Sequence, residues 1–262
     1  MDRRLSRPHG EADAAANAIY CVFNTPGAAE KYRQRYPNAA DRMVVLGNGY
    51  DEESFANLPE ASPAVASVPG VGKPMVLLHS GIVYPSERDP TQLFAALQSL
   101  HRHGRLTPAE LHIRFRASVH EGLLQGLATE YGVQDYIELC PAVPYREALA
   151  EMQAVDALLV MQASNCNAQI PAKIYEYLRA GRPIIALTDP VGDTAGVLRH
   201  AGLDAVVPLD SVEHIEAALP LFLEAVRSGR AELPEPEAVR GASRLARSQA
   251  LVKLLNQVAQ VP

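Results

Sequence analysis

"IPAKIYEYLRAGRPIIAL", residues 170–187, joins a short amphipathic helix to an apolar strand through a single glycine, Gly181. Such a helix–turn–strand unit is typical of α/β proteins. On this helix Lys173 and Glu176 stand three residues apart, so their side chains are surface neighbours. They form either an ordinary ion pair in solvent or part of a ligand site at the start of the helix. The rest of the chain has to distinguish these two interpretations.

Strand-like and helix-like segments alternate along the chain from residue 75 onward. Residues 156–162 are apolar along most of their length, as expected of a strand that helices cover on both faces. Helices between successive strands imply right-handed crossovers and parallel strands. The sequence therefore predicts an α/β fold with a doubly wound, mainly parallel, Rossmann-like sheet. The expected strands are residues 75–81, 110–117, 136–140, 156–162, 183–188 and 205–209.

The composition argues against several classes of protein. A net charge of −6 and an aromatic content of 6% disfavour nucleic-acid binding, which needs basic patches interleaved with aromatic residues. No apolar run reaches the roughly 18 to 20 residues that span a bilayer, and no apolar signal-peptide core follows the basic first residues. The cysteines, Cys21, Cys140 and Cys166, are far apart and lack the spacing of metal ligands. The expected location is therefore the reducing cytoplasm.

The loop after the first of these strands is one candidate ligand site, because open parallel sheets bind ligands outside the carboxyl ends of their strands. Gly81 comes directly after that strand, where a small residue allows close approach of the backbone. Arg88 follows in the same loop and could clamp a phosphate with two parallel hydrogen bonds. Alternatively, Arg88 is a surface arginine paired with Glu87 or Asp89, and both roles stay open.

The start of the 170–187 helix is the second candidate. Pro171 suits the first turn of a helix, where its missing N–H costs nothing. The free backbone amides of Ala172 and Lys173 would then favour an anion, aided by the helix dipole. One turn further on, Glu176 can accept two hydrogen bonds from a vicinal diol such as a ribose. An anion site beside a diol acceptor predicts a nucleoside diphosphate, and a solvated Lys173–Glu176 pair is the alternative.

Three segments, in the right order, resemble the GT-B fold glycosyltransferases of the large retaining class (group 1, family 4-like), which use nucleotide-sugar donors. "VVLGNGYDEESF", residues 44–55, resembles the Asn-Gly-x-Asp-x-x-x-Phe segment that closes the first domain of that family. "LLHSGIVYPSERDPTQLFAAL", residues 77–97, resembles the first strand and phosphate loop of its donor domain. Residues 170–187 resemble the donor-binding helix, which carries the second Glu of a Glu-x7-Glu motif. The resemblance covers roughly residues 20–225.

The resemblance implies a role for each matched residue. Glu176 would hold the donor ribose, and the backbone amides near Ala172 and Lys173 would meet the diphosphate. Arg88 and Lys173 would be catalytic, by neutralising the diphosphate as it leaves. Gly81 would let its loop approach the donor.

Further donor contacts follow from the same resemblance. The loop of residues 140–145 would line the base pocket through backbone groups at Ala142 and Val143, and Asn165 would hydrogen-bond sugar hydroxyls. No metal and no cofactor are expected, because protein cations stabilise the leaving diphosphate in such enzymes. The pattern is incomplete in one respect, since Ala168 stands where the family often has the first Glu of Glu-x7-Glu.

The expected function is transfer of a sugar from a nucleotide-diphosphate sugar to an unidentified acceptor, in synthesis of a cell-surface polysaccharide or glycoconjugate. The alternative is an inactive or partner-dependent nucleotide-sugar binding module. A third interpretation is a sugar-nucleotide epimerase of the same fold. An epimerase should carry catalytic carboxylates and histidines in these loops, and the only candidate histidines are His79 and His120.

The resemblance also divides the chain. Residues 1–58 would be a remnant of the acceptor domain, 59–74 a linker, 75–230 the donor-binding domain, and 231–262 a helix that returns toward the first domain. Because most of the acceptor domain would be absent, the expected partners include a separate acceptor-domain chain or a second copy. The basic half of the last helix offers a contact with the inner face of a membrane.

Overall fold

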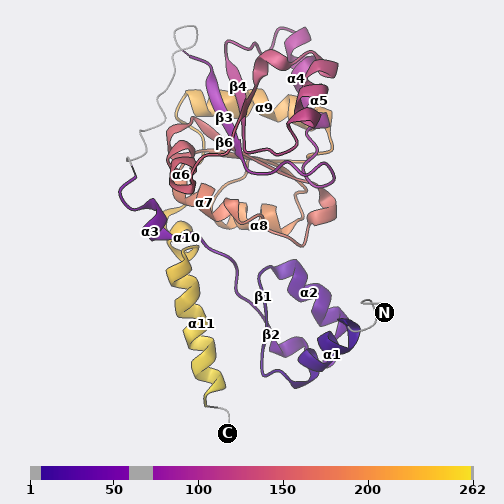
Figure 1. The fold of residues 1–262 in the computed structure, drawn as a ribbon, viewed down its shortest axis with the longest axis vertical. Helices are drawn as coiled ribbons and strands as arrows, with labels where there is room; N and C mark the ends of the chain where they lie inside the picture. The colour runs from indigo at the N-terminus through magenta and orange to yellow at the C-terminus, as the bar shows by residue number, and fades with distance from the viewer. Residues whose placement is uncertain (1–6, 59–72, 261–262) are drawn as a thin grey trace.

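The protein consists of a large sheet domain and a smaller first unit, with a long C-terminal helix beside the latter (Figure 1). The computed structural model describes residues 7–58 and 73–260. The linker predicted at 59–74 lies outside the described residues except for its last two positions. Within the described ranges, none of the helices combines the length and the apolar character needed to cross a bilayer.

The sheet domain confirms the predicted α/β class. Its sheet has six strands in the order β5-β4-β3-β6-β7-β8, and every neighbouring pair is parallel. The short β8 ends the sheet at one edge. The strands are β3 (Met75–Ser80), β4 (Leu111–Arg116), β5 (Ile137–Cys140), β6 (Ala157–Gln162), β7 (Ile184–Thr188) and β8 (Val206–Val207).

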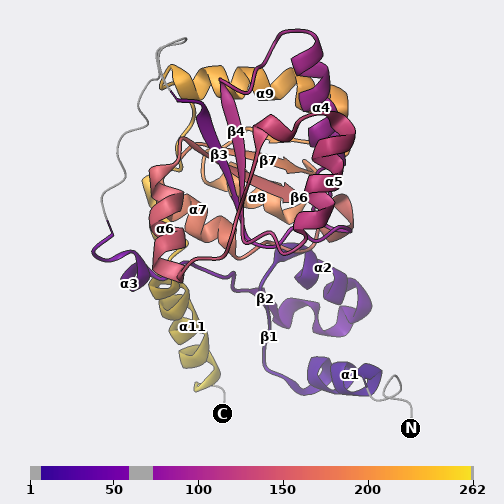
Figure 2. The same cartoon turned by 45° about the horizontal axis from the view of Figure 1, so that its top comes forward.

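Helices cover both faces of this sheet, with one group on each side (Figure 2). Alternate residues of a strand point to opposite faces, so Leu77 packs in the core under the first group and Leu78 in the core under the second. The apolar strands predicted from the sequence follow from this double burial. The first group is α4 (Thr91–Arg102), α5 (Glu121–Tyr131) and α9 (Val212–Arg227); the second is α6 (Tyr145–Ala154), α7 (Lys173–Ala180) and α8 (Asp193–His200).

The strand order fixes where a ligand can bind. From β3 the chain moves outward through β4 to β5, then returns to place β6 on the other side of β3. The loops that leave β3 and β6 therefore diverge to opposite faces and open a crevice at the carboxyl ends of these two strands. Gly81 follows β3 and Lys173 begins α7 after β6, so both lie at this crevice.

The first unit contains α1 (Arg7–Asn17), β1 (Cys21–Phe23), α2 (Pro26–Arg35) and β2 (Met43–Val45). Its two strands pair in parallel, and a 3-10 helix, Pro37–Arg42, leads into β2. A small core of Ala15, Ala39 and Met43 lies on one side. On the strands Val22 and Val45 stay 47% and 42% exposed, so this sheet lacks the second covering layer that parallel strands normally have.

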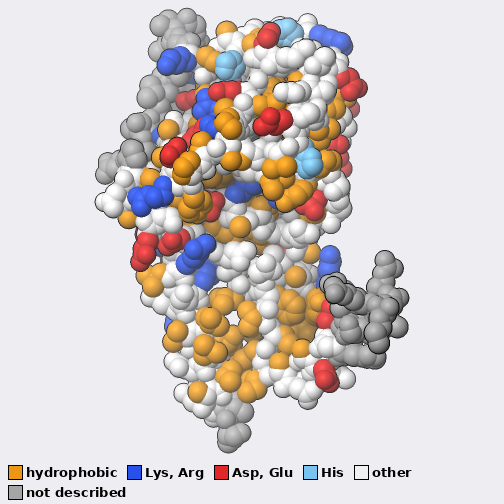
Figure 3. Space-filling view, viewed as in Figure 1, with side chains coloured by type: hydrophobic (Ala, Val, Ile, Leu, Met, Phe, Trp, Pro, Cys, Tyr) orange, Lys and Arg blue, Asp and Glu red, His pale blue; other side chains and the backbone are white. Residues whose placement is uncertain are grey.

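The chain ends in two helices where one was predicted, α10 (Pro236–Gly241) and α11 (Arg244–Val258). The Ser243 side chain accepts a hydrogen bond from the Ala246 amide and caps α11, which separates the two. None of the side chains of α11 is buried, and Leu245 and Leu255 are 68% and 55% exposed. Figure 3 shows hydrophobic side chains gathered over α11 and on the first unit opposite. The helix therefore lies beside the first unit without covering its apolar face.

Two hydrogen bonds join the first unit to the sheet domain. The Thr25 hydroxyl donates to the Ala168 carbonyl at 2.8 Å, and the Gly27 amide donates to Asp193 Oδ2 at 2.7 Å. A Cβ at Gly27 would lie 2.8 Å from Asp193 Oδ2 and 3.0 Å from Ala168, so the close approach requires glycine. The start of α2 thus lies against the loop after β6 and the start of α8.

We expect Asp193→Ala to loosen this contact. A hydrogen bond to a carboxylate contributes about 1.5–3 kcal/mol, so its loss should shift the balance between docked and separated units by about tenfold or more. Small-angle X-ray scattering should record a larger radius of gyration for the variant. Glu213→Ala removes an acidic residue from the first turn of α9 and is the matched control. Identical scattering from Asp193→Ala and wild type would show that the contact does not hold the units together.

Candidate functional site

The loop after β3 brings its backbone close to the start of α7. Gly81 has a φ of +109°, a conformation that favours glycine, and its amide donates to the Arg116 carbonyl at 2.8 Å. A Cβ at Gly81 would lie 3.6 Å from Lys173 Nζ. The predicted residues Gly81 and Lys173 are therefore neighbours, although the sequence separates them widely.

Arg88 lies in the same loop and is held by neutral groups. Its Nη1 donates to the Ile82 carbonyl at 2.7 Å, and its guanidinium stacks over the Tyr84 ring at 5.2 Å. Asp89 instead accepts hydrogen bonds from Thr91 at the start of α4, so the surface ion pair considered from the sequence is not formed with it. Arg88 Nε is buried without a hydrogen-bond partner in the part of the chain that the structure describes. Its charge is thus free to act on a ligand.

Two hydrogen bonds tie the loop after β6 to the loop after β3. The Ala163 amide donates to the Glu87 carbonyl at 2.7 Å, and Asn165 Nδ2 donates to the Ser86 carbonyl at 2.8 Å. The buried Gln162 side chain holds the loop from inside through the carbonyls of Cys166 and Gln169. The two loops at the switch point are therefore held against one another by hydrogen bonds.

Lys173 meets a histidine at the start of α7. Its Nζ lies 2.9 Å from Nε2 of His79, which is fully buried in β3. The other ring nitrogen of His79, Nδ1, lies 3.1 Å from the Leu159 carbonyl. A carbonyl only accepts hydrogen bonds, so Nδ1 carries the proton and Nε2 accepts from Lys173. The imidazole is therefore neutral, and burial together with the charge of Lys173 lowers the pKa of His79 well below its usual value.

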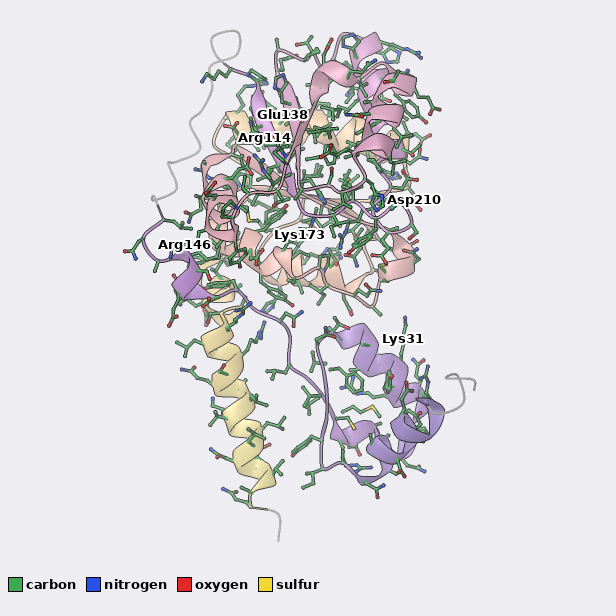
Figure 4. All side chains as sticks on the ribbon, in the orientation of Figure 1. Lys31, Arg114, Glu138, Arg146, Lys173 and Asp210 are labelled. Atoms are coloured by element: carbon green, nitrogen blue, oxygen red, sulfur yellow. The ribbon has the colours of Figure 1, made fainter. Side chains whose placement is uncertain are left out.

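The charge of Lys173 has no counter-ion. Burial lowers the pKa of Lys173 well below its usual value, and the positive charge of Arg88 lowers it further, while the charge of Glu176 raises it. Lys173 takes part in no ion pair within residues 7–58 and 73–260, and it points to His79 rather than to Glu176. Two cations at one crevice without a neutralising carboxylate favour an anionic ligand. Figure 4 shows Lys173 at the side of the sheet domain that faces the first unit.

The start of α7 differs slightly from the prediction. The helix begins at Lys173 with Ala172 as its N-cap, and Pro171 precedes the cap. The Ile174 amide donates to the Pro171 carbonyl at 3.0 Å, which adds a tight turn before the helix. The Ala172 and Lys173 amides have no acceptor among the described residues. Ala172 also lines a cavity of about 540 Å³, together with residues 46–49 and the first half of α11.

Glu176 meets the loop predicted to line the base pocket. Its Oε1 accepts a hydrogen bond of 2.6 Å from the hydroxyl of Tyr145, the first residue of α6. Burial and the charge of Glu176 raise the pKa of Tyr145. Ala142 and Val143 lie just before this helix, the first exposed and the second half-buried. The predicted ribose and base contacts are therefore adjacent.

The loop after β4 carries a feature that sequence patterns did not reveal. Ala117 and Val119 adopt positive φ angles of 55° and 67°, which cost energy for residues other than glycine. Two hydrogen bonds hold the loop, from the Ala117 amide to the Cys140 carbonyl and from the Val83 amide to the Ser118 carbonyl. Strained backbone of this kind is often retained at functional sites. Neither residue type signals such a conformation, so only the fold could reveal it.

The two histidines considered for an epimerase do not form a catalytic pair. His120 is an exposed residue before α5, and His79 contacts Lys173 and has no carboxylate partner among the described residues, so these do not assemble the catalytic groups expected of an epimerase. Nowhere in the described ranges do three or more His, Cys, Asp or Glu side chains gather as metal ligands. Arg114 and Glu138 form a 2.8 Å ion pair on the strands, away from Lys173 (Figure 4).

No protein-family model matches the sequence, and no curated protein is similar to it in sequence. Solved structures are similar in fold. Sucrose-phosphate synthase from Thermosynechococcus elongatus matches with a TM-score of 0.65 and 16% identity, over 97% of this chain and 63% of that one. A glycosyltransferase from Rickettsia africae matches with a TM-score of 0.69 and 12% identity, over 97% of this chain and 68% of that one. Anabaena HepE, solved with UDP and glucose, matches with a TM-score of 0.66 and 15% identity, over 95% of this chain and 66% of that one.

These matches cover nearly all of this chain, which spans 63% to 68% of the length of the three proteins. The matches extend over the sheet domain, the first unit and the C-terminal helices. The similarity therefore includes the arrangement of these parts and is not limited to the parallel sheet. The chain therefore has the GT-B fold of these glycosyltransferases.

Proposed function

We propose that this chain binds a nucleotide-diphosphate sugar and is the donor half of a glycosyltransferase. The observation that carries the proposal is the pair of cations, Lys173 and Arg88, without a counter-ion at the switch point of the sheet. Beside them Glu176 offers a carboxylate at the distance of one helical turn. Anabaena HepE, which has the same fold, was solved with UDP and glucose, which supports a ligand of this class.

Each proposed contact uses a group that keeps hydrogen-bonding capacity beyond its contacts within the described residues. The diphosphate meets Lys173, Arg88 and the amides at the start of α7. The ribose hydroxyls donate to Glu176, and the base lies along the backbone of Ala142 and Val143. Gly81 has no side chain to block this approach.

The sugar would lie beside the loop after β6. The Asn165 amide nitrogen already donates to the Ser86 carbonyl, which leaves Oδ1 to accept from a sugar hydroxyl. Ala168 replaces a carboxylate here, and its carbonyl accepts from Thr25 of the first unit. The sugar pocket is therefore closed partly by the first unit.

The cations explain how transfer would be accelerated. When the bond between the sugar carbon and the diphosphate oxygen breaks, the electron pair stays on the diphosphate. Lys173 and Arg88 stabilise that growing charge from fixed positions, and fixed charges aimed at the transition state are an effective form of catalysis. An acceptor hydroxyl then forms the new bond to the sugar carbon and loses its proton.

We expect Glu176→Ala to weaken nucleotide binding about 10- to 100-fold, because hydrogen bonds to a carboxylate each contribute about 1.5–3 kcal/mol. Calorimetric titration with UDP, GDP, ADP and dTDP measures this and identifies the base. Glu130→Ala, at an exposed position on α5, is the matched control. Wild-type protein that binds none of the four nucleotides would contradict the proposed function, and equal binding by Glu176→Ala would contradict the role of Glu176.

We also expect binding to be linked to protonation of Lys173. In the free chain burial and Arg88 lower the pKa of Lys173, and a bound diphosphate should raise it again. Binding should therefore take up as much as about one proton per nucleotide, and affinity should fall as pH rises between the free and bound pKa values. Titration above pH 7.5, in two buffers with different ionisation enthalpies, counts the protons while the charge of the nucleotide stays constant.

Two variants test whether Lys173 is the group that takes up a proton on binding. Lys173→Met should abolish the proton uptake and most of the binding. Because it also removes the hydrogen-bond donor to the buried His79 Nε2, a thermal unfolding scan of the free variant checks that the chain still folds. Lys31→Met changes an exposed lysine of the first unit and should leave the uptake unchanged. Proton uptake that persists in Lys173→Met would assign the linkage to another group.

A further inference from the structure

We propose that Tyr145 is a positioning residue that fixes the Glu176 carboxylate and so sets the preference of the site for ribose over 2′-deoxyribose. This inference rests on the proposed function. The observation behind it is the 2.6 Å hydrogen bond from the Tyr145 hydroxyl to Glu176 Oε1. A bond of this length from a hydroxyl to a charged carboxylate is among the strong hydrogen bonds of proteins.

Tyr145 is the only recorded hydrogen-bond partner of Glu176 among residues 7–58 and 73–260. Lys173, one turn earlier on α7, points to His79 instead. The neighbours of Glu176 in sequence, Tyr175 and Tyr177, are buried, so its backbone position is fixed. Only the Glu176 side chain retains freedom of rotation, and the Tyr145 hydroxyl removes it.

Hydrogen bonds and an ion pair hold the chain on both sides of Tyr145. Arg116 reaches Pro141 and Glu151, on either side of Tyr145 in the chain. It donates to the Pro141 carbonyl at 2.7 Å, and its Nη2 lies 2.7 Å from Glu151 Oε1. A further hydrogen bond joins Arg146, the next residue, to the Ala56 carbonyl. Tyr145 therefore starts from a backbone fixed on both sides.

The hydrogen bond leaves the carboxylate able to bind a diol. An ionised carboxylate offers about four acceptor positions, and Tyr145 occupies one of them on Oε1. The others can accept from the two hydroxyls of a ribose. Because the rotation of the Glu176 side chain is already restricted in the free chain, little conformational entropy of that side chain is lost when a ribose binds. Binding two hydroxyls at once requires one orientation of the carboxylate, whereas the single remaining hydroxyl of a 2′-deoxyribose can be reached from several. Fixing the carboxylate therefore favours the ribose.

Two other roles for Tyr145 lead to different results. Its ring is 47% exposed and could stack on the base, which would help ribonucleotides and deoxyribonucleotides equally. Its hydroxyl could instead occupy the place of a ribose hydroxyl, and its removal would then strengthen binding. Phenylalanine keeps the ring and removes only the hydroxyl, so Tyr145→Phe separates these roles.

The test is calorimetric titration of wild type and Tyr145→Phe with UDP, GDP and ADP and with their 2′-deoxy counterparts. Tyr145→Phe should weaken binding of the preferred ribonucleotide by about 3- to 10-fold and change the 2′-deoxynucleotide by less than about twofold. In a Glu176→Ala background, which leaves Tyr145 no side-chain acceptor at that position, the same substitution should have no further effect, because the two residues act as one unit. Tyr131→Phe, on α5 across the sheet, is the matched control.

The outcomes separate this inference from the proposed function. Wild type that binds none of these nucleotides overturns the proposed function and the role of Tyr145 with it. If wild type binds and Glu176→Ala weakens binding, three results overturn the role of Tyr145 alone. These are unchanged affinity in Tyr145→Phe, tighter binding in Tyr145→Phe, and an equal loss for the ribo and deoxy forms.

Discussion

The ammonium group of Lys173 lies against a neutral imidazole at the carboxyl end of the central strand, and no carboxylate in the described ranges balances its charge. This arrangement is unfavourable for an isolated protein, because burial of a cation without a counter-ion costs free energy. The core on both faces of the sheet supplies the stability that tolerates it. When a diphosphate binds as proposed, its charge would balance that of Lys173 and recover this free energy.

The position of the Lys173 ammonium group follows from the strand order. Because β3 lies between β4 and β6, the loops after β3 and β6 leave to opposite faces and open a crevice between them. Hydrogen bonds from Ala163 and Asn165 then tie the two loops together. The relative position of the two loops is therefore set by the strand order and by these hydrogen bonds.

The first unit contacts the loop after β6 and the start of α8 in the sheet domain. The start of α2 reaches Ala168 and Asp193, next to the loop where a donor sugar would lie. The same unit leaves Val22 and Val45 exposed opposite the exposed leucines of α11. The solved structures of this fold are longer than this chain. The smaller unit therefore contributes to the donor side of the crevice while its own sheet remains thin.

The sequence by itself determined the sheet class, the strands and the two loops at the crevice, because strand alternation and Gly, Pro and Lys positions are local signals. It also indicated Gly81, Arg88, Lys173 and Glu176, whose types suit a diphosphate and a ribose. Only the tertiary structure decided their partners: His79 for Lys173, Tyr145 for Glu176, and neutral groups for Arg88. These contacts join residues 94 and 31 positions apart for the first two pairs, and no local pattern encodes which side chains a parallel sheet brings together.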